Sequence, residues 1–85
     1  MDPMINGKVE FLRADLELTR TLISLAHTEK ELKNEDHFQH LRGEIQKAIR
    51  TLQRVIADHR IHIPPEDASQ FEKEIADCQI AYEQL

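Results

Sequence analysis

The stretch HRIHIPPED, residues 59–67, contains side chains whose types and spacing could bind a metal ion. His59 and His62 are three residues apart, so both imidazoles project from the same side of a helix, and Glu66 and Asp67 follow after two prolines. Helix ends offer a simpler explanation. Basic side chains in a last turn satisfy free carbonyl groups, and acidic side chains in the next first turn satisfy free amides. We interpret the stretch as a helix end and keep a histidine-based metal-binding sensor as an alternative function.

A second histidine pair, His37 and His40, lies at the other end of the same predicted helix. At 1.5 Å per residue the two pairs are about 33 Å apart, so they cannot share one ion within a protomer. A site built from either pair would need ligands from across a dimer interface. We therefore assign no metal ligands and expect no cofactor.

The segment HLRGE, residues 40–44, resembles part of the His-x-Leu-Lys-Gly pattern of histidine phosphotransfer helical bundles. In that family, an exposed histidine in the middle of a helix accepts a phosphoryl group. Here Gln39 occupies the position of the pattern's histidine, and Glu44 follows the glycine in place of a small residue. The resemblance implies a phosphotransfer module, with the phosphoryl group on His37 or His40, as a second alternative.

The sequence contains no pattern typical of an enzyme. It has no glycine-rich phosphate loop and no nucleophile at a recognisable spacing from a base. The single cysteine, Cys78, lies among apolar residues at helical spacing, which indicates a small core residue. We expect a protein that is not an enzyme.

Apolar residues at helical spacing predict three helices, over residues 3–32, 37–62 and 66–84. The composition agrees, because helix-favouring residues dominate and only 5% of the residues are aromatic. Short connections between the helices imply antiparallel neighbours. The predicted fold class is all-α: an antiparallel three-helix bundle, made of a long helical hairpin and a shorter third helix, in one domain of residues 1–85.

Local signals set the predicted boundaries inside the chain. Asp36 and Gln39 have the spacing of a capping box, which places the start of the second helix at about His37. Pro64 and Pro65 end that helix, because each lacks an amide hydrogen and each disfavours the helical conformation in the residue before it. The second proline can open the third helix.

The predicted first helix carries two apolar series on adjoining sides. They span roughly 200 degrees of its circumference, whereas an ordinary packed helix needs about 100 to 150 degrees. One series comprises Ile5, Val9, Leu12, Leu16, Ile23 and Ala26, and the other comprises Phe11, Leu18, Leu22, Leu25 and Leu32. We therefore expect a homo-oligomer, most simply a two-fold dimer in a larger helical bundle, with the second series at its interface.

Two points about the first helix stay open at the level of the sequence. Either apolar series could face inward, because both have helical spacing. Asp15 lies among the apolar residues, where it either marks the boundary between two interfaces or pairs with an arginine.

The charge and hydropathy of the chain limit its partners. A net charge of −5 opposes nucleic-acid binding, although Arg42, Arg50 and Arg54 form a basic row. The most apolar stretch, TLISLA, is far shorter than the roughly 20 residues that cross a bilayer, so we expect no membrane partner. One cysteine and no secretion signal indicate a cytoplasmic protein. Together these features predict a non-enzymatic interaction or regulatory module that self-associates and binds a protein partner.

Overall fold

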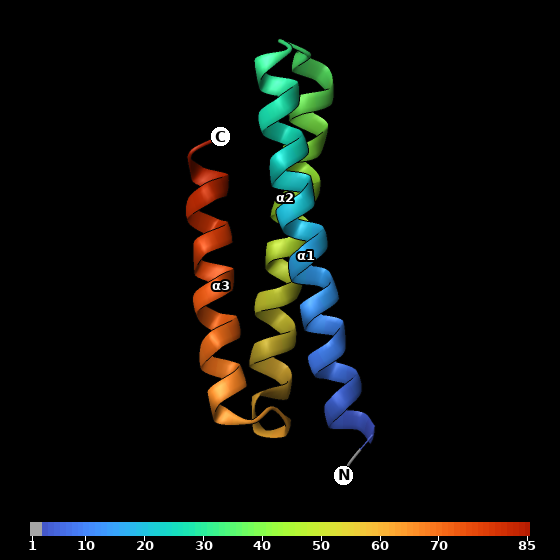
Figure 1. The fold of residues 1–85 in the computed structure, drawn as a ribbon, viewed down its shortest axis with the longest axis vertical. Helices are drawn as coiled ribbons and strands as arrows, with labels where there is room; N and C mark the ends of the chain where they lie inside the picture. The colour runs from blue at the N-terminus through green and yellow to red at the C-terminus, as the bar shows by residue number, and fades with distance from the viewer. Residues whose placement is uncertain (1–2) are drawn as a thin grey trace.

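The chain folds into three α-helices and one short 3-10 helix (Figure 1). The computed structural model describes residues 3–85, with side chains from Gly7 onward except that of Lys8. In order, the elements are α1 (Pro3–Glu31), α2 (Glu35–His59), η1 (Arg60–His62) and α3 (Pro65–Glu83). The predicted all-α three-helix bundle is confirmed, and residues 3–85 contain no strand. None of these helices is both long enough and apolar enough to cross a membrane.

The helices run alternately up and down, and α3 lies against one side of the hairpin formed by α1 and α2 (Figure 1). The molecule measures 48 × 20 × 16 Å along its principal axes. Two polar contacts hold α3 beside α1: Arg20 pairs with Glu74 at 3.3 Å, and Lys30 Nζ donates a hydrogen bond of 2.7 Å to the carbonyl oxygen of Leu85. As a result, α3 covers one flank of α1 and leaves the opposite flank without a neighbouring helix.

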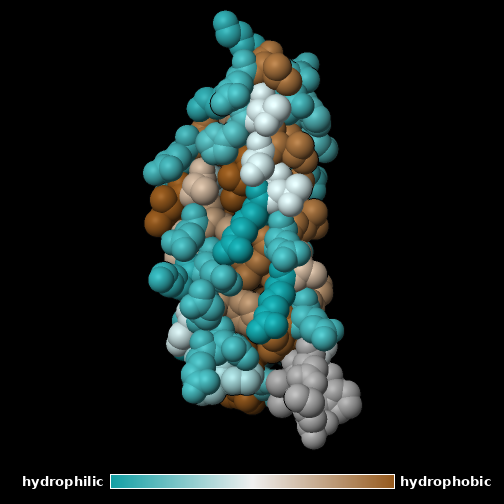
Figure 2. Space-filling model, viewed as in Figure 1, coloured by the Kyte–Doolittle hydropathy of each residue, from teal (hydrophilic) through white to brown (hydrophobic). Residues whose placement is uncertain are grey.

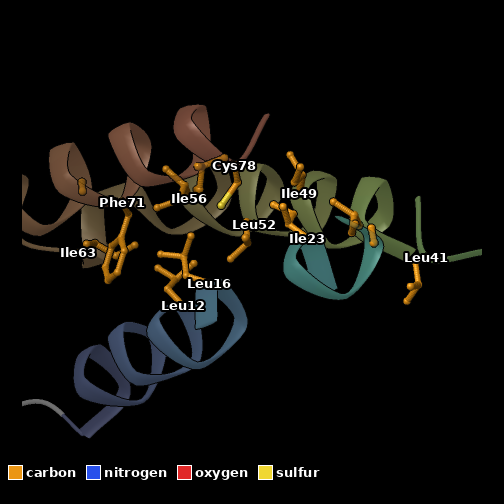
Figure 3. Packing of buried hydrophobic residues seen from close by; sticks show 14 of the residues in the cluster. Leu12, Leu16, Ile23, Leu41, Ile49, Leu52, Ile56, Ile63, Phe71 and Cys78 are labelled. Carbon is orange, nitrogen blue, oxygen red and sulfur yellow. The ribbon is translucent and has the colours of Figure 1, made fainter. Parts of the chain in front are cut away.

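One hydrophobic core runs along the bundle and receives side chains from all three helices. Its buried apolar residues are Leu12, Leu16, Ile23, Ala26, Phe38, Leu41, Ile45, Ile49, Leu52, Ile56, Ile63, Ala68, Phe71, Ile75 and Cys78. Figure 3 shows Leu12 and Leu16 of α1 pointing toward α2 and α3, with Ile63 and Phe71 side by side near one end. All four buried apolar residues of α1 belong to the first predicted series, which therefore faces inward. Its member Ile5 lies outside the described side chains.

A Schellman motif ends α1. The amide of Asn34 donates to the carbonyl oxygen of Glu29 at 3.0 Å, and the amide of Lys33 donates to that of Lys30 at 3.1 Å. Lys33 has a positive φ of 59°, as the motif requires at this position. The turn between the two long helices is therefore as short as this motif permits.

The second helix begins earlier than the sequence predicts. Asn34 closes the Schellman motif and is also the N-cap of α2, so the helix starts at Glu35 and not at about His37. The predicted capping box is wrong, because Gln39 Nε2 donates to Glu35 Oε1 at 3.0 Å instead of acting with Asp36. Because the same turn ends α1 and starts α2, no residue between the two helices is left to form a capping box.

The connection between α2 and α3 follows from the double proline. α2 ends at His59, three residues before its predicted end, because the chain tightens into η1, where the amide of Ile63 donates to the carbonyl oxygen of Arg60 at 3.2 Å. Ile63 has the extended backbone that a following proline favours, with φ −110° and ψ 131°, and its side chain is buried. After Pro64, α3 starts at once at Pro65.

The left-handed conformation of Lys33 yields a prediction about stability. This conformation is less stable by about 1 kcal/mol for a residue with a Cβ atom, whereas glycine adopts it without that cost. Lys33→Gly should therefore raise the free energy of unfolding by about 1 kcal/mol in urea denaturation. Lys33→Ala removes the same charge but keeps the Cβ atom, so it should change stability by less than about 0.5 kcal/mol. Equal stabilisation by both variants would attribute the effect to the charge.

Candidate functional site

The outward side of α1 leaves four large apolar side chains in water. Phe11, Leu18, Leu25 and Leu32 are 48%, 54%, 47% and 69% exposed, respectively. They are seven residues apart and follow one line over about 32 Å at 1.5 Å per residue. Leu32 is the first residue after α1, and its amide still donates to the carbonyl oxygen of Thr28 at 3.0 Å, so it continues the line. We term these four residues the apolar strip. They are four of the five residues that the sequence predicts for an oligomer interface.

The packing of α1 in the bundle explains why the strip is exposed. At 100 degrees per residue, the strip is centred about 150 degrees from the core-facing residues Leu12, Leu16 and Ile23. The ion pair between Arg20 and Glu74 places α3 on the other side of the helix. Figure 2 shows apolar surface along the right-hand edge of the molecule, on the side away from α3. The strip therefore lies beyond the reach of both other helices.

Leu22, the fifth predicted interface residue, lies at the edge of the strip. It is half-buried and packs against the core. Asp15 and Glu29, seven residues to either side of it, are also half-buried. The Glu29 carboxylate lies 3.2 Å from His37 Nδ1. These three residues of α1 mark the border between the core and the strip.

Asp15 has the environment of a boundary residue. Desolvation by burial raises the pKa of its carboxyl group above the ordinary value of 3.8. Its backbone carbonyl accepts a hydrogen bond of 2.7 Å from Thr19 Oγ1, which is fully buried. Among the described side chains, no ion pair involves Asp15. The first of the two interpretations, a boundary between two apolar surfaces, therefore fits its surroundings.

A series of small residues, which the sequence analysis missed, accompanies the strip. Each member stands four residues before a strip residue, and all are exposed: Gly7, Ala14, Thr21 and Thr28. Thr21 Oγ1 donates to the carbonyl oxygen of Glu17 at 3.0 Å, and Thr28 Oγ1 donates to that of Ser24 at 3.2 Å. A Cβ atom built on Gly7 would have no neighbour within 4 Å. The shared period of seven residues is the signal that could have revealed this small series.

The histidines lie in two separate places. His59 is half-buried at the end of α2 and His62 is exposed in η1, whereas His37 and His40 are exposed at the start of α2. α2 gives way to η1 directly after His59, so the two histidines of this pair lie in different elements. Within the described part of the chain, no three His, Cys, Asp or Glu side chains are grouped as a metal ion requires.

Cys78 and the basic row take part in packing. Cys78 is 3% exposed, and burial raises the pKa of its thiol although the nearby Arg20 guanidinium acts in the opposite direction. A protonated thiol is a poor nucleophile, so the cysteine serves as a small core residue. The Arg42 guanidinium lies 5.0 Å from the ring centroid of Tyr82, which joins α2 to the end of α3. One member of the basic row, Arg42, therefore packs within the bundle.

A cleft of about 330 Å³ separates part of α1 from α3. Its lining includes Arg13 and Arg20 together with Glu17, Asp67 and Glu74. Because two basic groups face three acidic ones, and Arg20 already pairs with Glu74, the cleft has no excess positive charge for an anionic ligand.

The apolar strip is thus the surface feature that calls for a functional explanation. Comparisons of the chain with models of known protein families, with curated proteins and with solved structures found no match. Function is therefore inferred from the residues of the chain alone.

Replacing His59 tests whether its imidazole makes a hidden contact. His59→Leu should keep the free energy of unfolding or raise it by up to about 1 kcal/mol, because an apolar side chain would replace a half-buried polar one. Urea denaturation with and without zinc measures this effect. A loss of more than about 1 kcal/mol in the absence of zinc would reveal a hydrogen bond to the imidazole, and zinc stabilisation found only in the unmodified chain would reveal a metal site.

The raised pKa of Asp15 predicts a pH-dependent effect. Burial disfavours the carboxylate in the folded chain, so its cost to stability is full above the raised pKa and disappears as the pH falls below 3.8. Asp15→Asn should therefore raise the free energy of unfolding at pH 7 and have little effect near pH 3. Glu10→Gln, at an exposed position of the same helix, is the control and should have little effect at neutral pH. If Asp15→Asn raises the free energy of unfolding as much near pH 3 as at pH 7, desolvation of the carboxylate is not the cause.

Proposed function

We propose that this protein is a non-enzymatic helical interaction module that forms a two-fold dimer through the apolar strip and binds a protein partner as a dimer. The observation that carries the proposal is the exposure of four large apolar residues at seven-residue intervals on a helix whose other side is fully packed. Soluble proteins rarely leave such a continuous line in water unless another molecule covers it.

The area of the strip is sufficient to support association. Large apolar side chains have a surface on the order of 200 Å² each, and roughly half of each strip residue is exposed, so one protomer exposes about 400 Å². Covering both copies at about 25 cal/mol per Å² gives on the order of 20 kcal/mol. This exceeds the roughly 4 to 15 kcal/mol that association costs in lost translational and rotational freedom. The strip can therefore form the centre of a dimer interface.

The period of the strip favours another helix as its cover. A repeat of seven residues keeps apolar side chains in line with a partner helix when both wind around each other with a left-handed twist. A second copy of α1 has the same period and the same length, and cyclic dimers are the commonest assemblies. A chain of 85 residues also buries only a modest core by itself, so self-association adds burial that the monomer lacks.

The surfaces that remain outside such a dimer are charged, which suits recognition of a protein partner. α3 carries six acidic residues and one basic residue, Lys73, whereas α2 exposes Lys47, Arg50 and Arg54. Surfaces of opposite charge favour specificity and rapid association more than affinity. The dimer would present two copies of each surface, and a partner that contacts both copies would gain from the resulting effective concentration.

Charge placed on the strip tests the proposed dimer. Sedimentation equilibrium at micromolar concentration should give twice the chain mass of 9.9 kDa. The double variant Leu18→Asp, Leu25→Asp should remain helical by circular dichroism, because both positions are exposed in the protomer. It should sediment as a monomer, because the proposed dimer would bury the two new charges.

Two exposed isoleucines outside the strip provide the matched control. Ile61 and Ile80 are 90% and 53% exposed, and the double variant Ile61→Asp, Ile80→Asp should remain a dimer. Sedimentation of the unmodified chain as a monomer would contradict the proposed function. Dissociation of both double variants to the same extent would show that the strip is not the interface.

A further inference from the structure

We propose that the two α1 helices of the dimer run antiparallel, with the apolar strip of each protomer packed against the small series of the other. This inference rests on the proposed self-association and adds the orientation and register of the two helices. It commits to a second copy of this chain as the molecule that covers the strip.

One antiparallel register places a small residue opposite every large one. It sets Phe11 opposite the partner's Thr28 and Leu18 opposite the partner's Thr21. In the same register, Leu25 faces the partner's Ala14 and Leu32 faces the partner's Gly7. The two-fold axis repeats all four contacts, so eight large residues of the dimer each meet a small one.

The volumes of the facing side chains distinguish this arrangement from a parallel one. In a parallel pair every residue faces its own copy, so layers of two phenylalanines or two leucines would alternate with layers of two small residues. The large layers would hold the helices apart, and the small layers would leave voids that forfeit packing contacts. In the antiparallel register each layer contains one large and one small side chain, so the helices keep a constant, short separation.

The two threonines of the small series are suited to a dry interface. The hydroxyl groups of Thr21 and Thr28 already donate to carbonyl oxygens of α1, so covering them leaves no unpaired donor. Their methyl groups remain available for contact with leucine and phenylalanine side chains. The local hydrogen bonds therefore turn two polar residues into small apolar surface.

Gly7 has no explanation within the protomer. Glycine lowers helix stability relative to alanine, and the structure leaves open space where its Cβ atom would lie. The proposed register supplies a reason, because the partner's Leu32 approaches the helix backbone at this position. A larger residue at Gly7 would push the end of the partner's strip away.

The rest of the bundle leaves room for the second helix. The strip lies about 150 degrees around α1 from the core-facing side, where both α2 and α3 pack. The strip also turns by about 20 degrees per seven residues on a straight helix, so the partner follows it with a left-handed twist. Asp15, Leu22 and Glu29, at the border of the strip, flank the pair of helices on the side of α2.

Adding apolar surface to the small series gives a test in which the two orientations predict opposite results. In the antiparallel register, Thr21→Leu sets two leucines against each other near the two-fold axis and should raise the dimer dissociation constant at least tenfold. In a parallel pair the new leucine would fill a layer of two small residues and tighten the dimer. Sedimentation equilibrium measures the constant, and a tighter dimer would overturn the inference.

Thr51 on α2 provides the matched control for this variant. It is exposed, and its Oγ1 donates to the carbonyl oxygen four residues earlier, Lys47, at 3.0 Å, just as Thr21 does in α1. Thr51→Leu should leave the dissociation constant unchanged. An equal weakening by both variants would show that the effect does not come from the small series and would overturn the register.

Disulfide trapping tests the orientation directly. Leu25→Cys and Ala14→Cys are made as two separate variants, each with Cys78→Ala to remove the native thiol, and are mixed in a glutathione buffer. In the antiparallel register these positions face each other across the dimer, whereas two copies of the same variant place their cysteines about 16 Å apart along the helix. Cysteines with Cα atoms more than about 7 Å apart do not bridge, so the mixed disulfide should predominate in mass spectrometry.

The other outcomes separate the register from the dimer itself. Disulfides between copies of the same variant would establish a parallel pair, which overturns this inference and leaves the proposed dimer intact. A dimer by sedimentation that forms none of these disulfides would overturn the register as well. Sedimentation of the unmodified chain as a monomer would overturn both the register and the proposed function.

Discussion

The apolar surface of α1 exceeds what two neighbouring helices can cover, and the rest of the structure depends on this imbalance. Leu12 and Leu16 are almost completely buried under α2 and α3, while Phe11 and Leu18, on the same turns of the helix, remain about half exposed. Burial of an apolar side chain is worth about 25 cal/mol per Å² removed from water, so the uncovered side is a source of free energy that the monomer does not use. Association with a second molecule is the direct way to use it.

The two connections between the helices keep the outward side of α1 uncovered. The Schellman turn after α1 and the double proline before α3 are both short, so each helix must pack beside the one before it. The ion pair from Arg20 to Glu74 and the hydrogen bond from Lys30 to Leu85 then keep α3 on one flank of α1. No described segment is free to fold over the other flank. The geometry that closes the core therefore also defines the exposed strip.

The sequence predicts much of the fold because the strongest signals are local. The apolar residues of α2 repeat at a regular helical interval, and the stereochemistry of Pro64 and Pro65 ends a helix regardless of its surroundings. The sequence predicts the start of α2 two residues too late, because the preceding turn relies on Lys33 in a conformation usually taken by glycine, and lysine gives no such signal in the sequence. That boundary depends on two helices at once and not on one local pattern.

The candidate site was predictable in part. The sequence identified both apolar series of α1 but could not tell which faces inward, because the choice depends on packing. Thr19 lies on the same inward face as that series although it is polar, and its buried hydroxyl is satisfied by the carbonyl oxygen of Asp15, a contact that hydropathy does not reveal. The small series went unnoticed because residues such as Ala14 and Thr21 carry little apolar signal alone. These small residues indicate an interface only because each stands four positions before a residue of the apolar strip.

The most direct test of the central claim, that the outward side of α1 is a self-association surface, is an isotope-filtered NMR experiment on a mixture of labelled and unlabelled chains. Such a spectrum contains only contacts between different molecules. We predict cross-peaks that join the methyl groups of Leu18 and Leu25 to residues of the partner's α1. A spectrum without intermolecular cross-peaks, or one in which they arise only from methyl groups of α2 and α3, would contradict the account.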